Sequence, residues 1–301
     1  MIVRTSQLRA HTNHVQWRGF STIRSTPGPS LYSQVMTPPN MNPEKNPTLV
    51  MHGLFGSHQN WRAIGKRLAA NTSAPVHLID LRNHGESPHT PDHSYDLMSE
   101  DVLRYIDSIN APKANLIGHS MGGKVVMNLA LREPEIIEKL VVVDISPINY
   151  KDSFKKFSDY IDIMKGLDLS KIKNRKQADD AIAPFVTQYT LRQFLLTNLR
   201  DISKDPSTPS FDWKINLEAL AKSMPDIRDF PQQGERVFRG PTLFLGGADS
   251  RYIASEYEET MRKLFPLHTT QFIGGAGHWV QAEKPEEFIK IVSAFLKGET
   301  E

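Results

Sequence analysis

Short apolar runs alternate with segments of helical periodicity along most of the chain. Continuous runs rich in β-branched residues are typical of parallel strands covered on both faces, and they lie at 48–51, 76–81, 114–117, 139–145, 242–245 and 269–273. Apolar residues at helical spacing predict helices at about 59–70, 95–109, 121–132, 255–265 and 285–296. This alternation predicts an α/β protein with a doubly wound, mostly parallel sheet, in which ligands bind at the carboxyl ends of the strands.

One long segment interrupts the alternation. From Pro147 to Arg236 only helical patterns are apparent, at about 154–164, 176–185, 190–199 and 216–223. A structureless loop of this length is improbable in a compact domain. The segment enters and leaves at the ligand-binding edge of the sheet, so we expect residues 147–236 to form a helical cap inserted over the site.

The N-terminal residues differ in composition from the rest. The first forty contain four Arg and ten Ser or Thr, and no acidic residue precedes Glu44. This is the composition of a mitochondrial transit peptide, and Arg18-Gly19-Phe20-Ser21 resembles a matrix-protease cleavage pattern. We therefore expect residues 1–20 to be a transit peptide cleaved near 20/21, followed by an extended lead-in over 21–46 with a short edge strand around 31–36, and then the main domain over 47–301. The competing interpretation is a disordered tail without a targeting function.

Composition narrows the remaining possibilities. The chain of 301 residues is 39% hydrophobic, which suits one large domain carrying an insertion. It contains no Cys, so disulfides and thiolate metal sites are excluded. Residues 1–20 hold three Arg and no acidic residue, so without them the formal net charge changes from +2 to −1. We therefore expect no surface that binds nucleic acid. No apolar stretch approaches the ~20 residues needed to cross a bilayer, so we also expect no membrane span.

The candidate chemistry centres on residues 116–123, which read Leu-Ile-Gly-His-Ser-Met-Gly-Gly. A predicted strand enters this Gly-x-Ser-x-Gly pattern and a predicted helix leaves it. A serine at such a turn has its hydroxyl exposed, and the small neighbours let the strand and helix pass closely. Ser120 is therefore a candidate nucleophile, and the Met121 amide at the helix N-terminus is a candidate oxyanion donor. The alternative is an ordinary Gly-rich turn before a helix.

Two further turns follow predicted strands. His52-Gly53-Leu54-Phe55-Gly56 lies at the end of the first core strand, and the Leu54 amide is the candidate for the second oxyanion donor. Asp80 to Pro88 forms a polar turn around Gly85. Its side chains either contact the substrate or form the hydrogen bonds that hold a structural turn.

A serine hydroxyl needs a base, and a carboxylate must hold that base in the correct tautomer. Among the eleven His residues we expect His278 to be the base, because it ends the last strand in a Gly-rich loop. His52, His84 and His119 each lie inside a turn motif where backbone packing accounts for them. In this class of site the His comes last in the chain, after the acid.

Two carboxylates are candidates for the acid. Asp144 follows the strand after the helix that leaves the Ser120 turn, and Asp249 follows the next core strand. Either residue is placed at the end of a strand from which it could reach the imidazole of His278. Geometry inferred from the sequence does not choose between them.

Five motifs taken together resemble one α/β-hydrolase family, which comprises mitochondrial abhydrolase-domain proteins, related small bacterial esterases and the ethanol acetyltransferases of yeasts. The motifs cover about residues 47 to 297, and they are His52 to Ser57, Asp80 to His89, Gly118 to Lys124, Val142 to Pro147 and Gly277-His278-Trp279. The resemblance implies an α/β-hydrolase fold. It also implies Asp144 as the acid, since the position of Asp249 is used by many other α/β-hydrolases but is often Asn in this family.

These features predict a mitochondrial serine hydrolase that cleaves carboxylic esters or thioesters through an acyl-enzyme, with Ser120, Asp144 and His278 as the triad. No metal or organic cofactor is needed for this chemistry. The substrate would be a small acyl ester or thioester. The first alternative is an alcohol O-acyltransferase with a donor such as acetyl-CoA and an alcohol acceptor. A non-catalytic protein-binding scaffold is disfavoured because Ser120 and His278 are both present, and a metal-dependent hydrolase because the His residues lack i, i+4 spacing.

Overall fold

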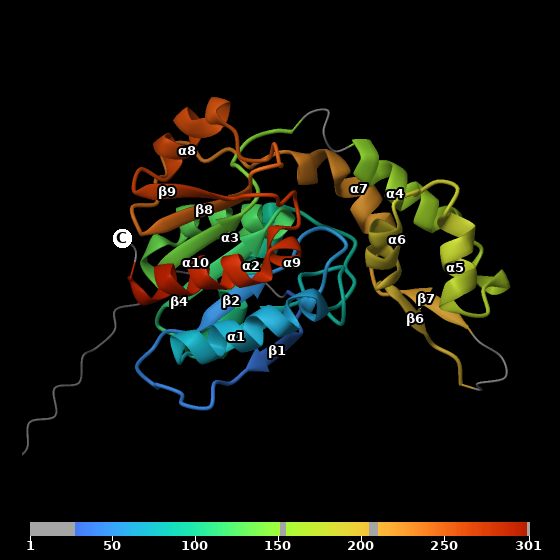
Figure 1. Ribbon diagram of the computed structural model, residues 1–301, viewed down its shortest axis with the longest axis horizontal. Helices are drawn as coiled ribbons and strands as arrows, with labels where there is room; N and C mark the ends of the chain where they lie inside the picture. The colour runs from blue at the N-terminus through green and yellow to red at the C-terminus, as the bar shows by residue number, and fades with distance from the viewer. Residues whose placement is uncertain (1–27, 151–154, 205–209, 300–301) are drawn as a thin grey trace, which may run out of the picture.

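The main sheet has seven strands in the order β1-β3-β2-β4-β5-β8-β9 (Figure 1). The computed structural model describes residues 28–150, 155–204 and 210–299, so the predicted transit peptide and its cleavage site lie outside the described residues. β1 is antiparallel to β3 and every other neighbouring pair is parallel, which confirms the doubly wound, mostly parallel sheet. The strands are β1 (Ser33–Met36), β2 (Thr48–Met51), β3 (Val76–Ile79), β4 (Ala114–His119), β5 (Ile137–Val143), β8 (Thr242–Gly247) and β9 (His268–Ile273).

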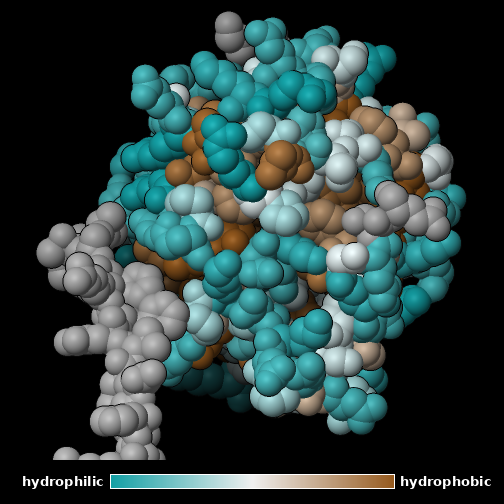
Figure 2. Space-filling view, turned by 90° about the vertical axis from the view of Figure 1, so that its left-hand side faces the viewer, coloured by the Kyte–Doolittle hydropathy of each residue, from teal (hydrophilic) through white to brown (hydrophobic). Residues whose placement is uncertain are grey.

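Helices cover both faces of the sheet because the strand residues are apolar on both sides. Alternate residues of β2, β4 and β5 pack into two separate apolar clusters. One cluster contains α2 (Tyr95–Ser108), α3 (Met121–Arg132) and α8 (Glu258–Leu264), and the other contains α1 (Arg62–Thr72) and α10 (Pro285–Lys297). The end of the molecule turned away from the inserted segment is mainly hydrophilic, with separate apolar areas (Figure 2).

The inserted segment between β5 and β8 lies to one side of the sheet (Figure 1). Its helices are α4 (Lys155–Gly166), α5 (Arg175–Ile182), α6 (Tyr189–Leu196) and α7 (Leu217–Arg228). The expectation of helices alone was wrong, because β6 (Leu199–Asp201) and β7 (Phe211–Trp213) pair as a second, antiparallel sheet. Each of these strands has three residues, too few for a period-2 pattern to be recognised.

Some predicted boundaries also differ. The helix expected over 255–265 is divided into a 3₁₀ turn, Ser255–Tyr257, and α8. The short helices η2 (His58–Trp61), η3 (Pro134–Ile136), η4 (Leu169–Lys171) and α9 (Val280–Glu283) complete the described elements. α7 extends five residues beyond the predicted end at Ser223 even though it contains Pro225, a residue that usually marks a helix boundary.

Strand register brings the site together at one edge of the sheet. His119, the last residue of β4, pairs with Val143, the last residue of β5. The next residues, Ser120 and Asp144, therefore leave the ends of adjacent strands. The parallel pairing of β8 with β9 places the loop that contains His278 at the same edge.

Candidate active site

Ser120 lies in a strained turn between β4 and α3. Its φ is 53° and its ψ is −116°, a region that disfavours residues with a side chain. The backbone N–H of Ser120 donates to the carbonyl of Val143 at 3.0 Å. The strand and helix can cross closely only because glycines flank the turn, since a β-carbon on Gly118 would lie 2.2 Å from the carbonyl oxygen of Gly122.

The imidazole of His278 is hydrogen-bonded to Asp144. Nδ1 of His278 lies 2.7 Å from Oδ2 of Asp144, and the Asp144 carboxylate is fully buried. An ionised carboxylate only accepts hydrogen bonds, so the proton of a neutral His278 is on Nδ1 and the lone pair on Nε2 is available as a base. Asp144 also has a positive φ, 48°, and its oxygens accept further bonds from the N–H of Gly247 at 3.2 Å and from Ser250 Oγ at 2.6 Å.

Asp249, the alternative acid, is exposed. Its backbone N–H donates to the carbonyl of Ala276 at 2.9 Å, which joins the loop after β8 to the loop after β9. The neighbour Ser250, rather than Asp249, reaches the carboxylate of Asp144. The structure therefore brings Asp144 to His278, as the resemblance implies.

The two candidate oxyanion donors follow the ends of neighbouring strands, Leu54 after β2 and Met121 after β4. Met121 is the first residue of α3, and the first N–H groups of a helix have no acceptor within it. Leu54 follows Gly53, whose carbonyl accepts hydrogen bonds from the N–H of Gly56 at 2.9 Å and from His52 Nδ1 at 2.8 Å. The Gly53 carbonyl and the Leu54 N–H share one trans peptide plane and point in opposite directions, so these two bonds also fix the direction of the Leu54 N–H.

The buried histidines around the site are neutral and hydrogen-bond to the main chain. His52 Nε2 accepts from the N–H of Leu81 at 3.1 Å, which leaves its proton on Nδ1, and burial lowers its pKa to about 4. His119 Nε2 donates to the backbone carbonyl of His278 at 2.9 Å, and burial lowers its pKa to about 3. His84 is buried in the same way, with a pKa lowered to about 3. The interpretation of these three residues as parts of turns agrees with their contacts.

The polar turn from Asp80 to Pro88 is held by hydrogen bonds within it and by contacts with neighbouring segments. Asp80 accepts hydrogen bonds from the backbone N–H of His58 at 2.6 Å and of Glu86 at 2.9 Å. Arg82 forms a buried ion pair with Asp101. This turn does not line the pocket described below, so of its two interpretations the structure supports the structural one.

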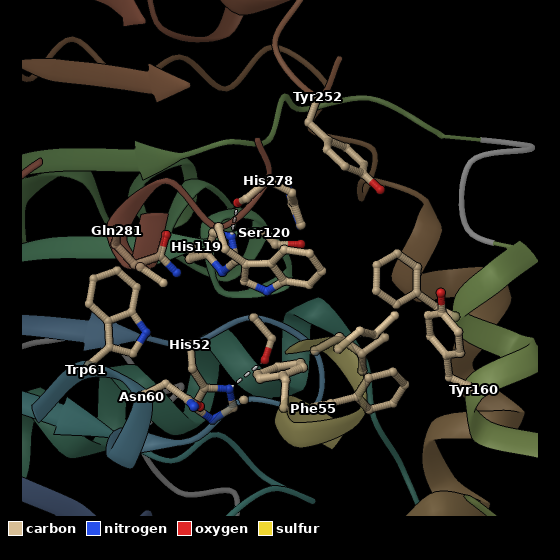
Figure 3. Close-up of a pocket in the computed structure, with 18 of the residues that line it drawn as sticks. His52, Phe55, Asn60, Trp61, His119, Ser120, Tyr160, Tyr252, His278 and Gln281 are labelled. Carbon is tan, nitrogen blue, oxygen red and sulfur yellow. Dashed lines mark hydrogen bonds between the residues drawn. The ribbon is translucent and has the colours of Figure 1, made fainter. Parts of the chain in front are cut away.

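Ser120 and His278 open onto one cavity of about 300 Å³ (Figure 3). The core contributes His52, Leu54, Phe55, Trp61 and His119, and the inserted segment contributes Phe157, Tyr160, Gln188, Leu191 and Phe194. The walls are mostly apolar, as is usual for small-molecule sites. Sequence reasoning missed Ser250 and Gln281, because neither lies in a motif. Their contacts with the site depend on how the loops after β8 and β9 fold back.

Two negative findings apply to the described ranges. No group of three or more His, Asp or Glu side chains there is arranged to hold a metal ion. No helix in the same ranges is long and apolar enough to cross a membrane.

Residues 46–285 match the family model described as alpha/beta hydrolase fold, and the chain belongs to this family. It is 41% identical to the sn-1-specific diacylglycerol lipase ABHD11 of Danio rerio over 84% of this chain and 79% of that protein. It is 36% identical to the probable alcohol acetyltransferase of Saccharomyces cerevisiae, with coverages of 83% and 77%. Among solved structures, a marine microorganism esterase has a TM-score of 0.82 and 33% identity, and the match covers 89% of this chain and all of that one. These relatives agree with an enzyme that hydrolyses esters.

Proposed function

We propose that Ser120, His278 and Asp144 form a catalytic triad that hydrolyses carboxylic esters or thioesters through an acyl-enzyme. The observation that carries this proposal is the 2.7 Å hydrogen bond between His278 and the buried Asp144. His278 lines the same cavity as Ser120. The family membership and the esterases and lipases among the relatives support it.

In the acylation step, Ser120 Oγ attacks the carbonyl carbon of the ester and His278 Nε2 accepts the hydroxyl proton. The carbonyl oxygen becomes an oxyanion, which the N–H groups of Leu54 and Met121 stabilise. The bond to the leaving alcohol or thiol then breaks, and His278 returns the proton to that group. Asp144 keeps the imidazole oriented and stabilises its positive charge.

Deacylation repeats these steps with water. His278 Nε2 takes a proton from a water molecule, whose oxygen attacks the acyl carbon. When the tetrahedral intermediate collapses, the proton returns to Ser120 Oγ and the carboxylic acid is released. No metal or redox cofactor takes part in these proton and acyl transfers.

Active-site labelling tests this proposal. A fluorophosphonate should label the protein, and Ser120→Ala should abolish both labelling and p-nitrophenyl acetate hydrolysis while the circular dichroism spectrum is unchanged. Ser108→Ala, at the exposed end of α2, is the matched control and should keep both activities. Labelling retained in Ser120→Ala would contradict the proposal.

Acyl transfer to an alcohol is a second candidate for the same site. Similarity to a probable alcohol acetyltransferase supports it, and an alcohol in place of water would resolve the same acyl-enzyme. Acetyl-CoA would then be the donor. Incubation with acetyl-CoA and ethanol should yield ethyl acetate as well as acetate, and acetate alone at high ethanol concentration would rule out this candidate.

For the location we propose the mitochondrion. The Arg-rich and Ser-rich composition of residues 1–40 supports it. A fusion of residues 1–45 to a fluorescent reporter should enter mitochondria, and the mature chain should begin near Ser21. A diffuse cytosolic reporter would contradict this proposal.

A further inference from the structure

The ring of Tyr252 lies against the imidazole of His278 (Figure 3). The two ring centroids are 4.3 Å apart and the ring planes make an angle of 39°. Two other rings are further from this imidazole, that of His119 at 4.8 Å and that of Trp279 at 5.7 Å. A cation within about 6 Å of the centre of an aromatic face is attracted by the negative charge of that face. Tyr252 is therefore close enough to stabilise a positive charge on His278.

Hydrogen bonds hold the main chain of Tyr252 at both of its polar groups. Its N–H donates to Ser250 Oγ at 3.3 Å, and its carbonyl accepts from Ser146 Oγ at 2.9 Å and from the hydroxyl of Tyr150. Ser250 Oγ also donates to the carboxylate of Asp144. The ring is thus held in place before any charge develops, so no rearrangement is needed when the charge forms.

Tyr252 is half-buried and lies between two cavities. One is the cavity onto which Ser120 and His278 open, and the other is a second cavity of about 490 Å³, which Tyr150 and Tyr257 also line. A side chain with a cavity on each side fills less of the hydrophobic core than one that is enclosed by protein. Core packing alone therefore does not account for an aromatic ring at this position.

Several titratable groups surround the imidazole of His278. They are Asp144 after β5, His119 at the end of β4, His52 after β2, Lys156 and Tyr160 of α4, and Glu283 of α9, which accepts hydrogen bonds from the main chain on both sides of His278. Burial lowers the pKa of His119 to about 3 and that of His52 to about 4, so both are neutral. The loop after β8 adds Asp249 and Arg251, which are exposed. A substitution of the stacked tyrosine changes none of these groups, so its effect on the titration of His278 reports the aromatic ring.

We propose that Tyr252 is a positioning residue for the hydrolysis, because its ring holds the imidazole of His278 and stabilises the protonated form of that imidazole. This role rests on the proposed triad, in which His278 Nε2 takes the hydroxyl proton of Ser120 and the imidazole becomes positively charged. Asp144 stabilises this charge through Nδ1, and Tyr252 stabilises it from one face of the ring.

The pH dependence of kcat/KM for p-nitrophenyl acetate tests this role, because its acid limb reports protonation of the base in the free enzyme. Tyr252→Leu removes the aromatic face, so the plateau of kcat/KM should fall about 3- to 30-fold. The midpoint of the acid limb should move to lower pH by about 0.5 to 1.5, because protonated His278 is less stable. Tyr252→Phe keeps the face and should stay within about 2-fold of the wild type with an unchanged midpoint.

Fluorinated rings separate the effect of charge from that of packing. Phenylalanine with one, two or three ring fluorines, incorporated in place of Tyr252, has nearly the shape of phenylalanine but a progressively less negative face. The midpoint of the acid limb should fall step by step along this series. A constant midpoint would overturn the inference even if Tyr252→Leu failed to fold.

Tyr257→Leu is the matched control. Tyr257 lines the second cavity and packs against Tyr150 at 5.9 Å between ring centroids, and its replacement should leave both the plateau and the midpoint unchanged. A midpoint that is unchanged or raised in Tyr252→Leu would overturn the inference. A ring that only excludes water would, on removal, let solvent stabilise the protonated imidazole and raise the midpoint.

A proton NMR titration measures the midpoint of the His278 ring without turnover, with its signal assigned by its loss in His278→Gln. This midpoint should also fall in Tyr252→Leu and stay constant in Tyr252→Phe. Failure of the proposed function is distinguishable, because a wild type that is not labelled at Ser120 would hydrolyse no ester, while the NMR titration would still decide whether the ring of Tyr252 stabilises protonated His278.

Discussion

His119 donates a hydrogen bond from Nε2 to the backbone carbonyl of His278 at 2.9 Å, and the two rings lie 4.8 Å apart (Figure 3). The residue directly before the proposed nucleophile thus holds the main chain of the proposed base. Because Ser120 directly follows His119, the last residue of β4, this bond fixes the loop of His278 relative to the serine.

A positioning role for His119 predicts a difference between two substitutions. His119→Leu removes the donor and should lower kcat about 10- to 100-fold, since small displacements of a catalytic group have effects of this size. His119→Gln keeps an N–H donor near the position of Nε2 and should retain most activity. Steady-state kinetics should show the change in kcat rather than in KM. Equal losses in both variants would indicate a packing role instead.

The two carboxylates at the strand ends should respond differently to amide substitution. Asp144→Asn should reduce kcat by roughly four orders of magnitude, because an amide favours the wrong imidazole tautomer. Asp249→Asn should keep a substantial fraction of activity, because Asp249 is exposed and lies outside the contact with His278. Both proteins should remain folded by circular dichroism. An inactive Asp249→Asn with an active Asp144→Asn would show that the acid is wrongly assigned.

Lys124 joins α3 to both ends of the inserted segment. Its buried Nζ donates to the carbonyls of Ile148 at 3.1 Å, Arg228 at 2.9 Å and Asp229 at 2.7 Å. Burial lowers the pKa of this lysine to about 7.

Lys124→Met should therefore leave three carbonyls without this donor. Buried groups that lose a partner destabilise by about 1–3 kcal/mol each, so we expect the free energy of unfolding to fall by roughly 3 kcal/mol or more. A urea titration measures this loss. Lys165→Met, in an exposed pair with Glu218, is the control and should change stability by less than about 1 kcal/mol. Similar midpoints for the two variants would contradict the role of Lys124.

The buried histidines predict acid sensitivity. The lowered pKa values of His52, His84 and His119, about 4, 3 and 3, mean that these rings stay neutral in the fold and gain protons on unfolding. Their contribution to the free energy of unfolding is fully present above pH ~6.5, and it is lost as the pH falls toward their pKa values in the folded protein. Each contributes up to about 1.4 kcal/mol per pH unit in that window.

Urea titrations between pH 6.5 and 5 measure this effect. The slope of the unfolding free energy against pH is proportional to the number of protons taken up on unfolding. In His119→Gln this number should be smaller by about one, and the slope should be smaller accordingly. An unchanged slope would mean that His119 is not a neutral buried ring.

The sheet could be predicted from the sequence because each parallel strand is covered on both faces and is apolar along its length. β5 is an example, with Leu140 to Val143 fully buried. Ser120 and His278 could be named for a related reason, since Gly-containing turns at strand ends have strong local signals.

Contacts made across loops could not be predicted. The choice between Asp144 and Asp249 depends on which carboxylate turns toward His278, and strand spacing alone does not contain this information. Ser250 and His119 contact partners more than 100 residues away in the sequence, so no local pattern predicts these contacts.

The positive φ angles of Ser120 and Asp144 imply a trade-off between stability and activity in this protein. Each such residue stores about 1–3 kcal/mol of backbone strain, and glycine would relieve it while removing the reactive group. Ser120→Gly should therefore be inert and yet no less stable than the wild type. Selection for heat resistance alone would favour inactive variants at these two positions, so any search for a more stable form must screen for turnover at the same time.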